Sequence, residues 1–314
     1  VQLGNAEHRV SVSIGVTLFG DAAGEGIDEP LKRADLAMYQ AKLAGRNALR
    51  FFDPQMQASV RARAELEAGL WSALDKGQFC LHFQPQVDAD GVIFGVEALV
   101  RWLHPERGLV PPADFIPLAE ENGLIVPLGR WVLQTACAQL AAWARDPATA
   151  RLSIAVNVSA RQFRQDGFVD EVLDCLARCG ADPAQLELEL TESTLVTDID
   201  TIGSKMDALK ASGVRFSLDD FGTGYSSLAY LKRLPLDQLK IDRDFVRDIL
   251  VDPNDAAIAR MITVLADTLG LSVIAEGVET EAQRDFLAQQ GCRAYQGYLF
   301  SRPLSLAEKN APSR

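Results

Sequence analysis

The sequence predicts an α/β fold whose main domain is a modified TIM-type (β/α)8 barrel. Eight short β-rich runs follow one another along the chain, and helical patterns separate most of them. Such an alternation over about 240 residues is typical of this barrel, which gathers the carboxyl ends of its strands at one mouth. The runs are residues 79–83, 93–99, 152–156, 186–190, 214–218, 238–241, 272–275 and 292–295.

The connections between these runs define the topology. Helical periodicity covers residues 124–144, 168–179, 199–211 and 256–269. Only residues 87–92 separate the first two runs, whereas a parallel crossover needs about a dozen residues or more. We therefore expect the first strand to be antiparallel to the second, so that the barrel is irregular at its start.

The N-terminal residues predict a small α+β fragment ahead of the barrel. Residues 10–18 alternate like a half-buried strand, a helical pattern ends before Gly45, and residues 48–52 form a further short apolar run. These elements are too few for a core of their own, so we expect a partner segment upstream. Residues 54–74 are helical, either as a connection between domains or as the first helix of the barrel domain.

Composition narrows the class of protein. The chain of 314 residues carries 31 Lys and Arg against 43 Asp and Glu, a net charge of −12, which argues against a DNA-binding protein. No apolar run reaches the roughly 18 residues of a membrane span, and no signal peptide opens the chain. Five cysteines without C-x-x-C spacing favour reduced thiols and a cytoplasmic location. Because Val1 is first, we expect a longer parent, which segments outside this chain could tether to a membrane.

Polar residues mark the carboxyl ends of runs two to eight. A single strand-end carboxylate is more often a helix cap or a turn residue than a ligand. Seven successive runs with such a residue instead favour one shared site at the barrel mouth. The residues are Glu97, Asn157, Glu189, Asp219, Asp220, Lys240, Glu276 and Gln296.

The charges of this set point to its chemistry. Five carboxylates in one cleft would repel one another unless cations neutralised them. Oxygen ligands without His or Cys favour Mg²⁺ or Mn²⁺, and the set is large enough for two ions. Two metals are the recurrent device for cleaving phosphodiesters, with Lys240 orienting water or phosphate. A structural cluster of ion pairs is the alternative.

The segment Asp219-Asp220-Phe221-Gly222-Thr223-Gly224 contains a kinase-like triplet and two glycines. A kinase is excluded by context, since no lysine-bearing glycine loop or His-Arg-Asp segment accompanies the triplet. The glycines instead predict a mobile loop that carries Asp220 into the site.

Taken together, residues 65–306 resemble an EAL domain, the family of cyclic di-GMP phosphodiesterases, with residues 307–314 as a tail. The signature Glu97-Ala98-Leu99 extends to Val100-Arg101-Trp102. The other motifs are Phe83-Gln84-Pro85, Asn157-Val158-Ser159, Glu189-Leu190-Thr191-Glu192, the Asp219–Gly224 segment above, Lys240-Ile241-Asp242, Ala275-Glu276-Gly277-Val278-Glu279 and Gln296-Gly297-Tyr298.

The resemblance implies hydrolysis of cyclic di-GMP to linear pGpG with two Mg²⁺ or Mn²⁺ ions, in a homodimer formed through this domain. It assigns Glu97, Asn157, Glu189 and Asp219 to the first metal, and Asp219, Asp220 and Glu276 to the second. Lys240 would contact the attacking water, and Gln84, Leu99, Arg101 and Gln296 would bind substrate. Glu192 would steady the Asp220 loop. A non-catalytic cyclic di-GMP receptor is the alternative, and the completeness of the ligand set disfavours it.

Residues 1–52 resemble the C-terminal part of a GGDEF (diguanylate cyclase) domain, with residues 53–64 as a linker. The motifs are Ser13-Ile14-Gly15-Val16, Ala34-Asp35-Leu36-Ala37-Met38-Tyr39-Gln40-Ala41-Lys42 and Gly45-Arg46-Asn47. Lys42 and Arg46 match phosphate-contacting positions of that family. The signature loop and the metal-binding strand are absent from this chain, so we expect no cyclase activity from it. The resemblance also implies a sensor or GGDEF region upstream.

Overall fold

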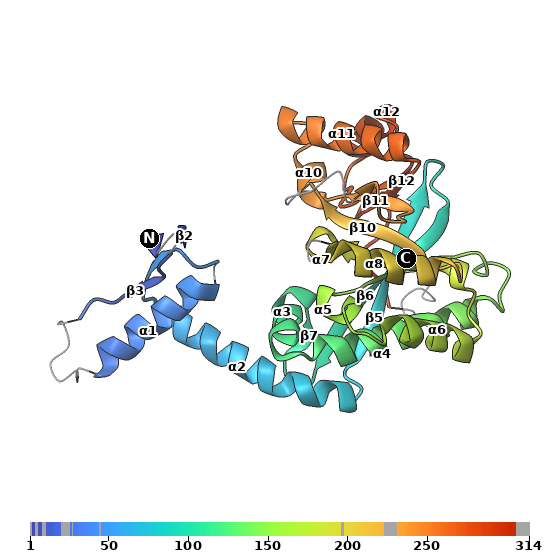
Figure 1. Ribbon diagram of the computed structural model, residues 1–314. Helices are drawn as coiled ribbons and strands as arrows, with labels where there is room; N and C mark the ends of the chain where they lie inside the picture. The colour runs from blue at the N-terminus through green and yellow to red at the C-terminus, as the bar shows by residue number, and fades with distance from the viewer. Residues whose placement is uncertain are drawn as a thin grey trace, which may run out of the picture. The chain divides into compact units, whose positions relative to one another are not determined.

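The computed structural model describes residues 2–3, 6–7, 11–19, 26, 28–43, 45–195, 198–222 and 231–305 (Figure 1). The chain divides into two compact units, residues 1–72 and residues 73–314. No helix of the described ranges is long and apolar enough to cross a membrane.

The first unit combines short strands with a long helix. Strand β3 (Ile14–Val16) pairs in parallel with β4 (Leu49–Phe51), and β1 (Gln2–Leu3) pairs with β2 (Ala6–Glu7) in antiparallel orientation. Helix α1 (Asp28–Leu43) joins β3 to β4, and α2 (Pro54–Asp75) begins in this unit. The short N-terminal fragment therefore contains the predicted helix and strand.

The prediction of a half-buried strand over residues 10–18 is wrong in extent and in orientation. Residue 10 lies outside the described residues, only Ile14–Val16 is a strand, and Val12 and Ile14 are 62% and 45% exposed. Helix α1 packs on the other face of the strand, the face of Gly15. The contact is close: a methyl group on Gly15 would lie 2.0 Å from the Ala34 carbonyl oxygen. The glycine, rather than the apolar residues beside it, faces the helix.

In the second unit, eight strands close into a barrel (Figure 1). Strand β5 is antiparallel to both of its neighbours, β6 and β13, whereas the remaining neighbours are parallel. The predicted fold class and the antiparallel first strand are confirmed. The strands are β5 (Phe79–Asp88), β6 (Ile93–His104), β8 (Ser153–Asn157), β9 (Leu186–Thr191), β10 (Arg215–Phe221), β11 (Gln238–Ile241), β12 (Ser272–Ala275) and β13 (Ala294–Gln296).

The first strand is longer than predicted. It continues through Pro85 to Asp88, where the sequence suggested an end at residue 83. Proline removes one backbone donor from the ladder but leaves the other hydrogen bonds intact, so β5 and β6 form a long hairpin. A short strand β7 (Gly108–Val110) extends this sheet beyond β6.

Helices surround the barrel. The four predicted helices are present, and α3 and α12, which the periodicity did not reveal, are additional. Gly180 and Gly270 adopt the left-handed conformation that ends α6 and α11, and Thr280 and Gln283 form a capping box on α12. The helices are α3 (Pro112–Asn122), α4 (Ile125–Trp143), α5 (Ala160–Phe163), α6 (Phe168–Cys179), the 3₁₀ turn η1 (Pro183–Gln185), α7 (Glu192–Leu195), α8 (Ile199–Lys210), α10 (Arg243–Arg247), α11 (Pro253–Leu269) and α12 (Glu281–Gln289).

The core lies between the outer face of the barrel and the helices. Outward-facing Phe216 of β10 packs against Phe163, which in turn contacts Phe168 at the start of α6. Since the outward-facing side chains fill this layer, the inward-facing ones are free to be polar. None of the five cysteines forms a disulfide.

Gly297, which directly follows β13, is packed closely against the backbone of Val278. A methyl group there would lie 2.1 Å from the Val278 carbonyl oxygen, whereas one on Gly167 would meet no atom within 4 Å. We expect Gly297→Ala to lower the free energy of unfolding by about 1–3 kcal/mol, because backbone has to move. The control Gly167→Ala should stay within about 0.5 kcal/mol of the parent. Urea denaturation followed by tryptophan fluorescence measures both, and equal midpoints would contradict the expectation.

Candidate active site

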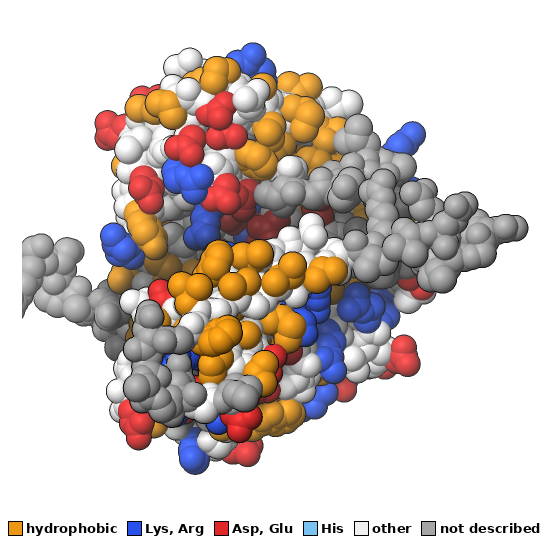
Figure 2. Space-filling view, turned by 90° about the vertical axis from the view of Figure 1, so that its left-hand side faces the viewer, with side chains coloured by type: hydrophobic (Ala, Val, Ile, Leu, Met, Phe, Trp, Pro, Cys, Tyr) orange, Lys and Arg blue, Asp and Glu red, His pale blue; other side chains and the backbone are white. Residues whose placement is uncertain are grey.

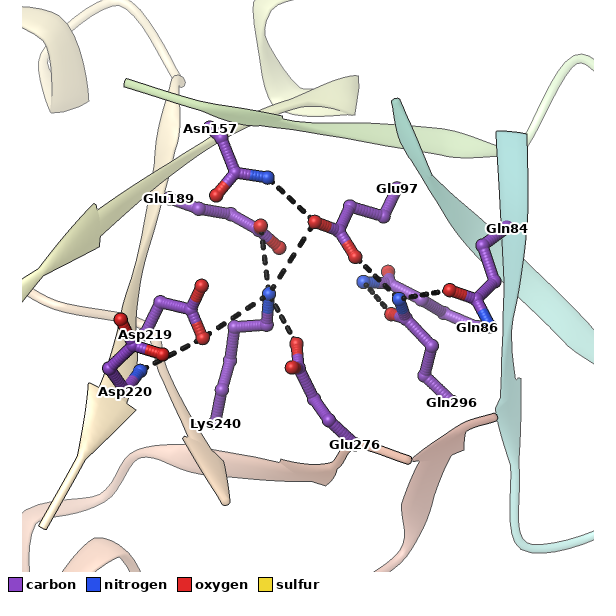
Figure 3. A network of polar contacts seen from close by, with 10 residues as sticks. All are labelled: Gln84, Gln86, Glu97, Asn157, Glu189, Asp219, Asp220, Lys240, Glu276 and Gln296. Atoms are coloured by element: carbon purple, nitrogen blue, oxygen red, sulfur yellow. Dashed lines mark hydrogen bonds and ion pairs between the residues drawn. The ribbon is translucent and has the colours of Figure 1, made fainter. Parts of the chain in front are cut away.

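The residues predicted at strand ends meet in one place inside the barrel (Figure 3). Glu97 differs from the prediction, because β6 continues beyond it to His104. Asn157 ends β8, Glu189 lies near the end of β9, and Lys240 lies in β11. Glu276 directly follows β12, and Gln296 ends β13. Residues that are up to about two hundred positions apart in the sequence therefore face one centre, as expected for this architecture.

Lys240 is at that centre. Its side chain is fully buried, and its Nζ lies 2.5 Å from Glu276 Oε1 and 2.8 Å from Glu189 Oε2. Asp219 Oδ1 is 3.6 Å away and Glu97 Oε1 is 4.0 Å away. One ammonium group thus neutralises part of the charge of four carboxylates.

This crowding shifts the ionisation of the whole cluster. Burial raises the pKa of Glu189 well above its ordinary range, and it raises that of Glu276 to about 8. Burial alone would lower the pKa of Lys240, but the surrounding carboxylates raise it well above its ordinary value. Glu97 differs, since Lys240 and side-chain hydrogen bonds outweigh the effect of burial and lower its pKa. Lys240 therefore stays charged in this site.

Side-chain amides hold Glu97 from two sides. Asn157 Nδ2 donates to Glu97 Oε1 at 2.6 Å, and Gln296 Nε2 donates to Glu97 Oε2 at 2.5 Å (Figure 3). Gln296 Nε2 also approaches Gln84 Oε1 at 3.2 Å, and its Oε1 accepts a hydrogen bond from Gln86 at 3.1 Å. Gln86 was missed in the sequence, although its position two residues after Gln84 puts both on the same face of β5.

The end of β10 has an unusual backbone. Asp220 has a φ of +57°, and its N–H donates to Asp219 Oδ1 at 2.9 Å. Burial, followed by the charges of Asp219 and Asp242, raises the pKa of Asp220 to about 6. Glu192 Oε1 accepts a hydrogen bond from the Gly222 N–H at 2.7 Å, so Glu192 holds the start of the predicted glycine loop. The rest of that loop, residues 223–230, lies outside the described residues.

A cavity of about 720 Å³ opens above this cluster. Seven predicted residues line it: Gln84, Glu97, Leu99, Arg101, Asp220, Glu276 and Gln296. The cavity is also lined by Asp242, Glu279 and Tyr298, which belong to the motifs above but had no predicted role, and by Arg243 and Asp244, which the sequence did not single out. Of these, Asp242 directly follows β11, so its place at a strand end was a usable signal. In Figure 2, acidic and basic side chains lie next to one another around a hollow of the molecular surface.

A second cavity, of about 310 Å³, adjoins the first, and Leu99 and Pro112 line both. Its wall is mostly apolar and includes Ile116, Leu128 and Val132. Asn157 lies at its edge. The site therefore combines a wide polar cavity with a smaller apolar one.

Residues 67–303 match the EAL domain family. The chain belongs to the EAL-domain family. The match covers most of the chain and includes every predicted site residue.

Several relatives of this EAL-domain chain carry names that describe enzymes of cyclic di-GMP metabolism. The bifunctional diguanylate cyclase/cyclic di-GMP phosphodiesterase MucR of Pseudomonas aeruginosa is 48% identical over 305 residues, which cover 96% of this chain and 44% of MucR. The cyclic di-GMP phosphodiesterase PdeR of Escherichia coli is 41% identical over 303 residues, which cover 96% of this chain and 45% of PdeR. The chain thus spans less than half the length of these relatives.

Solved structures of EAL domains have the same fold as this chain. A MucR phosphodiesterase in complex with c-di-GMP superposes with a TM-score of 0.75 at 50% identity, covering 78% of this chain and 99% of that one. The FimX EAL domain of Xanthomonas citri in complex with c-di-GMP gives a TM-score of 0.71 at 25% identity, covering 80% and 97%.

The carboxylate and amide oxygens of this site are the type of ligand that divalent cations such as Mg²⁺ and Mn²⁺ prefer. Both Glu189 oxygens and Glu276 Oε1 are buried and have no hydrogen-bond partner among the described residues, although Lys240 Nζ lies 2.8 Å from Glu189 Oε2 and 2.5 Å from Glu276 Oε1. In the described ranges, however, no three carboxylates surround a single point closely enough to hold a metal. The Lys240 ammonium lies between them, so these side chains would have to turn from it to share an ion.

Lys240→Met should destabilise the barrel strongly. It leaves the buried carboxylates without a counter-charge, and we expect the free energy of unfolding to fall by about 3 kcal/mol. Lys210 provides the control, since its Nζ also lies 2.8 Å from a carboxylate, that of Asp237, but its side chain is 31% exposed. Lys210→Met should cost at most about 1 kcal/mol. Similar urea midpoints for the two variants would refute this account of Lys240.

Proposed function

We propose that this chain hydrolyses cyclic di-GMP to linear pGpG with the help of two divalent cations, Mg²⁺ or Mn²⁺. The observation that carries the proposal is the meeting of Lys240 with the carboxylates of Glu97, Glu189, Asp219 and Glu276 at the barrel mouth. A receptor that only binds the nucleotide has no need of a buried lysine among four acids. The names of MucR and PdeR support the same substrate.

The residues of the site would have separate roles in binding the cations and the attacking water. Glu97, Asn157, Glu189 and Asp219 would hold one cation, and Asp219, Asp220 and Glu276 the other. When bound, such cations lower the pKa of water and stabilise charge on the phosphate. Lys240, released from part of its carboxylate contacts, would hold the attacking water. Glu192 would keep the Asp220 segment in place through Gly222.

The two cavities suit the shape of a cyclic dinucleotide, which carries phosphates between two flat bases. Arg101 lines the larger cavity and would pair with a phosphate. Gln84 and Gln296 lie beside Glu97 and would fix the sugar-phosphate next to the acids. One guanine would enter the smaller apolar cavity past Leu99, and the other would remain near Tyr298.

The direct test is incubation with cyclic di-GMP and Mg²⁺ or Mn²⁺, with chromatography of the products. We expect pGpG, and we expect EDTA to abolish its formation. Glu97→Ala should reduce kcat by at least about 100-fold, since it removes a ligand and the acceptor of two amide hydrogen bonds. Glu106→Ala changes an exposed glutamate of the β6–β7 turn and should leave kcat unchanged. Tight binding of cyclic di-GMP without any pGpG would favour the receptor alternative and reject catalysis.

The smaller cavity provides a test of substrate placement. Ile116→Trp would fill it, so we expect KM for cyclic di-GMP to rise by about tenfold or more while kcat changes little. Val92→Trp, at an exposed position of the β5–β6 turn, is the control for an added indole. Steady-state kinetics give KM and kcat for both variants. An unchanged KM for Ile116→Trp would show that no base of the substrate binds in this cavity.

We further propose that residues 1–52 are the C-terminal part of a GGDEF domain, joined through residues 53–64 to an EAL domain over residues 65–306. The match to MucR supports this, because it covers 96% of the chain and so extends well ahead of residue 67. The parent protein would carry the upstream region and act in the cytoplasm as a homodimer through its EAL domain. The fragment itself would have no cyclase activity.

A further inference from the structure

The interior of the barrel remains polar below the catalytic cluster. Barrels of this type usually fill the interior with Val, Ile and Leu. Here Glu187, Ser217 and Gln238 precede Glu189, Asp219 and Lys240 by two residues on β9, β10 and β11 respectively. Side chains two residues apart on a strand share a face, so the first three form a second layer directly beneath the cluster. We call Glu187, Ser217 and Gln238 the lower layer.

Strand register makes the lower layer continuous with the site. Ser217 is the register partner of Glu189 on one side and of Gln238 on the other. Neighbouring strands lie about 4.8 Å apart, so these side chains are adjacent along the barrel wall. Arg215, the partner of Glu187, is partly exposed and donates from Nη2 to Glu187 Oε2 at 2.6 Å, which places an ion pair at the base of the layer.

Each member of the lower layer has a buried polar atom without a hydrogen-bond partner among the described residues. The side chains of Glu187, Ser217 and Gln238 are 3%, 0% and 3% exposed. The unpaired atoms are Glu187 Oε1, Ser217 Oγ and Gln238 Oε1. Buried polar atoms of native proteins are nearly always paired, and three unpaired ones on adjacent strands require a common explanation.

The chemistry of these atoms specifies the missing partner. A carboxylate oxygen and an amide oxygen only accept hydrogen bonds, and the Ser217 hydroxyl has a single proton to donate. The three atoms therefore cannot satisfy one another. Water donates two protons and typically makes about three hydrogen bonds when buried. The small Ser217 side chain, where other barrels have a branched aliphatic one, leaves space for it.

We propose that ordered water, bound by Glu187, Ser217 and Gln238, forms a layer inside the barrel that supports Glu189 and Lys240 from below. These three are positioning residues for the hydrolysis proposed above, on which this part of the inference rests. They touch neither substrate nor phosphate. By filling the space beneath the cluster with hydrogen-bond donors, the water layer keeps the Glu189 carboxylate and the Lys240 ammonium at their places beside the other acids.

Two variants of nearly equal shape separate the effect of the Ser217 hydroxyl from that of added bulk. Ser217→Val and Ser217→Thr add side chains of nearly equal size, but only threonine keeps the hydroxyl. Because outer-layer groups that orient metal ligands are worth about 10–100-fold, we expect Ser217→Val to lower kcat by that factor with KM nearly unchanged. Ser217→Thr should retain most of the parent kcat. A merely structural role would affect both variants alike, so equal kcat values for the two would overturn the positioning role.

A crystal structure of the parent chain tests the water layer independently of turnover. We expect ordered water within hydrogen-bond distance of Ser217 Oγ, Gln238 Oε1 and Glu187 Oε1, and its loss in Ser217→Val. Direct contacts among these three side chains with no water between them, or a cation in that place, would overturn the proposal. If the parent chain lacks turnover but the water is present, the proposed hydrolysis fails and the water layer stands.

Discussion

The contact between a fully buried ammonium group and four carboxylates constrains the rest of this structure. In a medium of low polarity, each of these charges would be costly alone, and the attraction between them offsets the cost only when the geometry is close. Lys240 meets that condition at 2.5 Å from Glu276 and 2.8 Å from Glu189. The strands that carry these residues must therefore keep their register, since a shift of one residue would turn every acid away from the lysine.

The barrel makes such an interior possible. Each of its strands pairs with two neighbours, and its apolar contacts are made on the outer face, against the helices. The inner face can then be given to amides and charges. Asn157 and Gln296 each donate to Glu97, and the same amide chain reaches Gln84 and Gln86 on the antiparallel strand. The irregular first hairpin thus contributes directly to the site.

The strong negative charge of the chain is compatible with an anionic substrate for the same reason. Part of the acidic excess lies in the cluster around Lys240, where one ammonium group does not neutralise it. Such a cluster attracts cations, and cations in turn attract phosphate. Under the proposed function, binding of the nucleotide would thus be conditional on metal, and the −12 net charge would not oppose it.

The sequence by itself determined the barrel, its antiparallel start and the residues at its mouth, because alternating strands and helices and a six-residue connection leave few other topologies. It did not reveal that β5 continues past Pro85, that Gly15 rather than its apolar neighbours faces α1, or that Gln86 and Asp242 join the site. Those features depend on contacts between distant segments. Only the tertiary structure decided that Lys240 is the shared counter-ion of four acids, because periodicity gives the face of a strand but not the distances across a barrel.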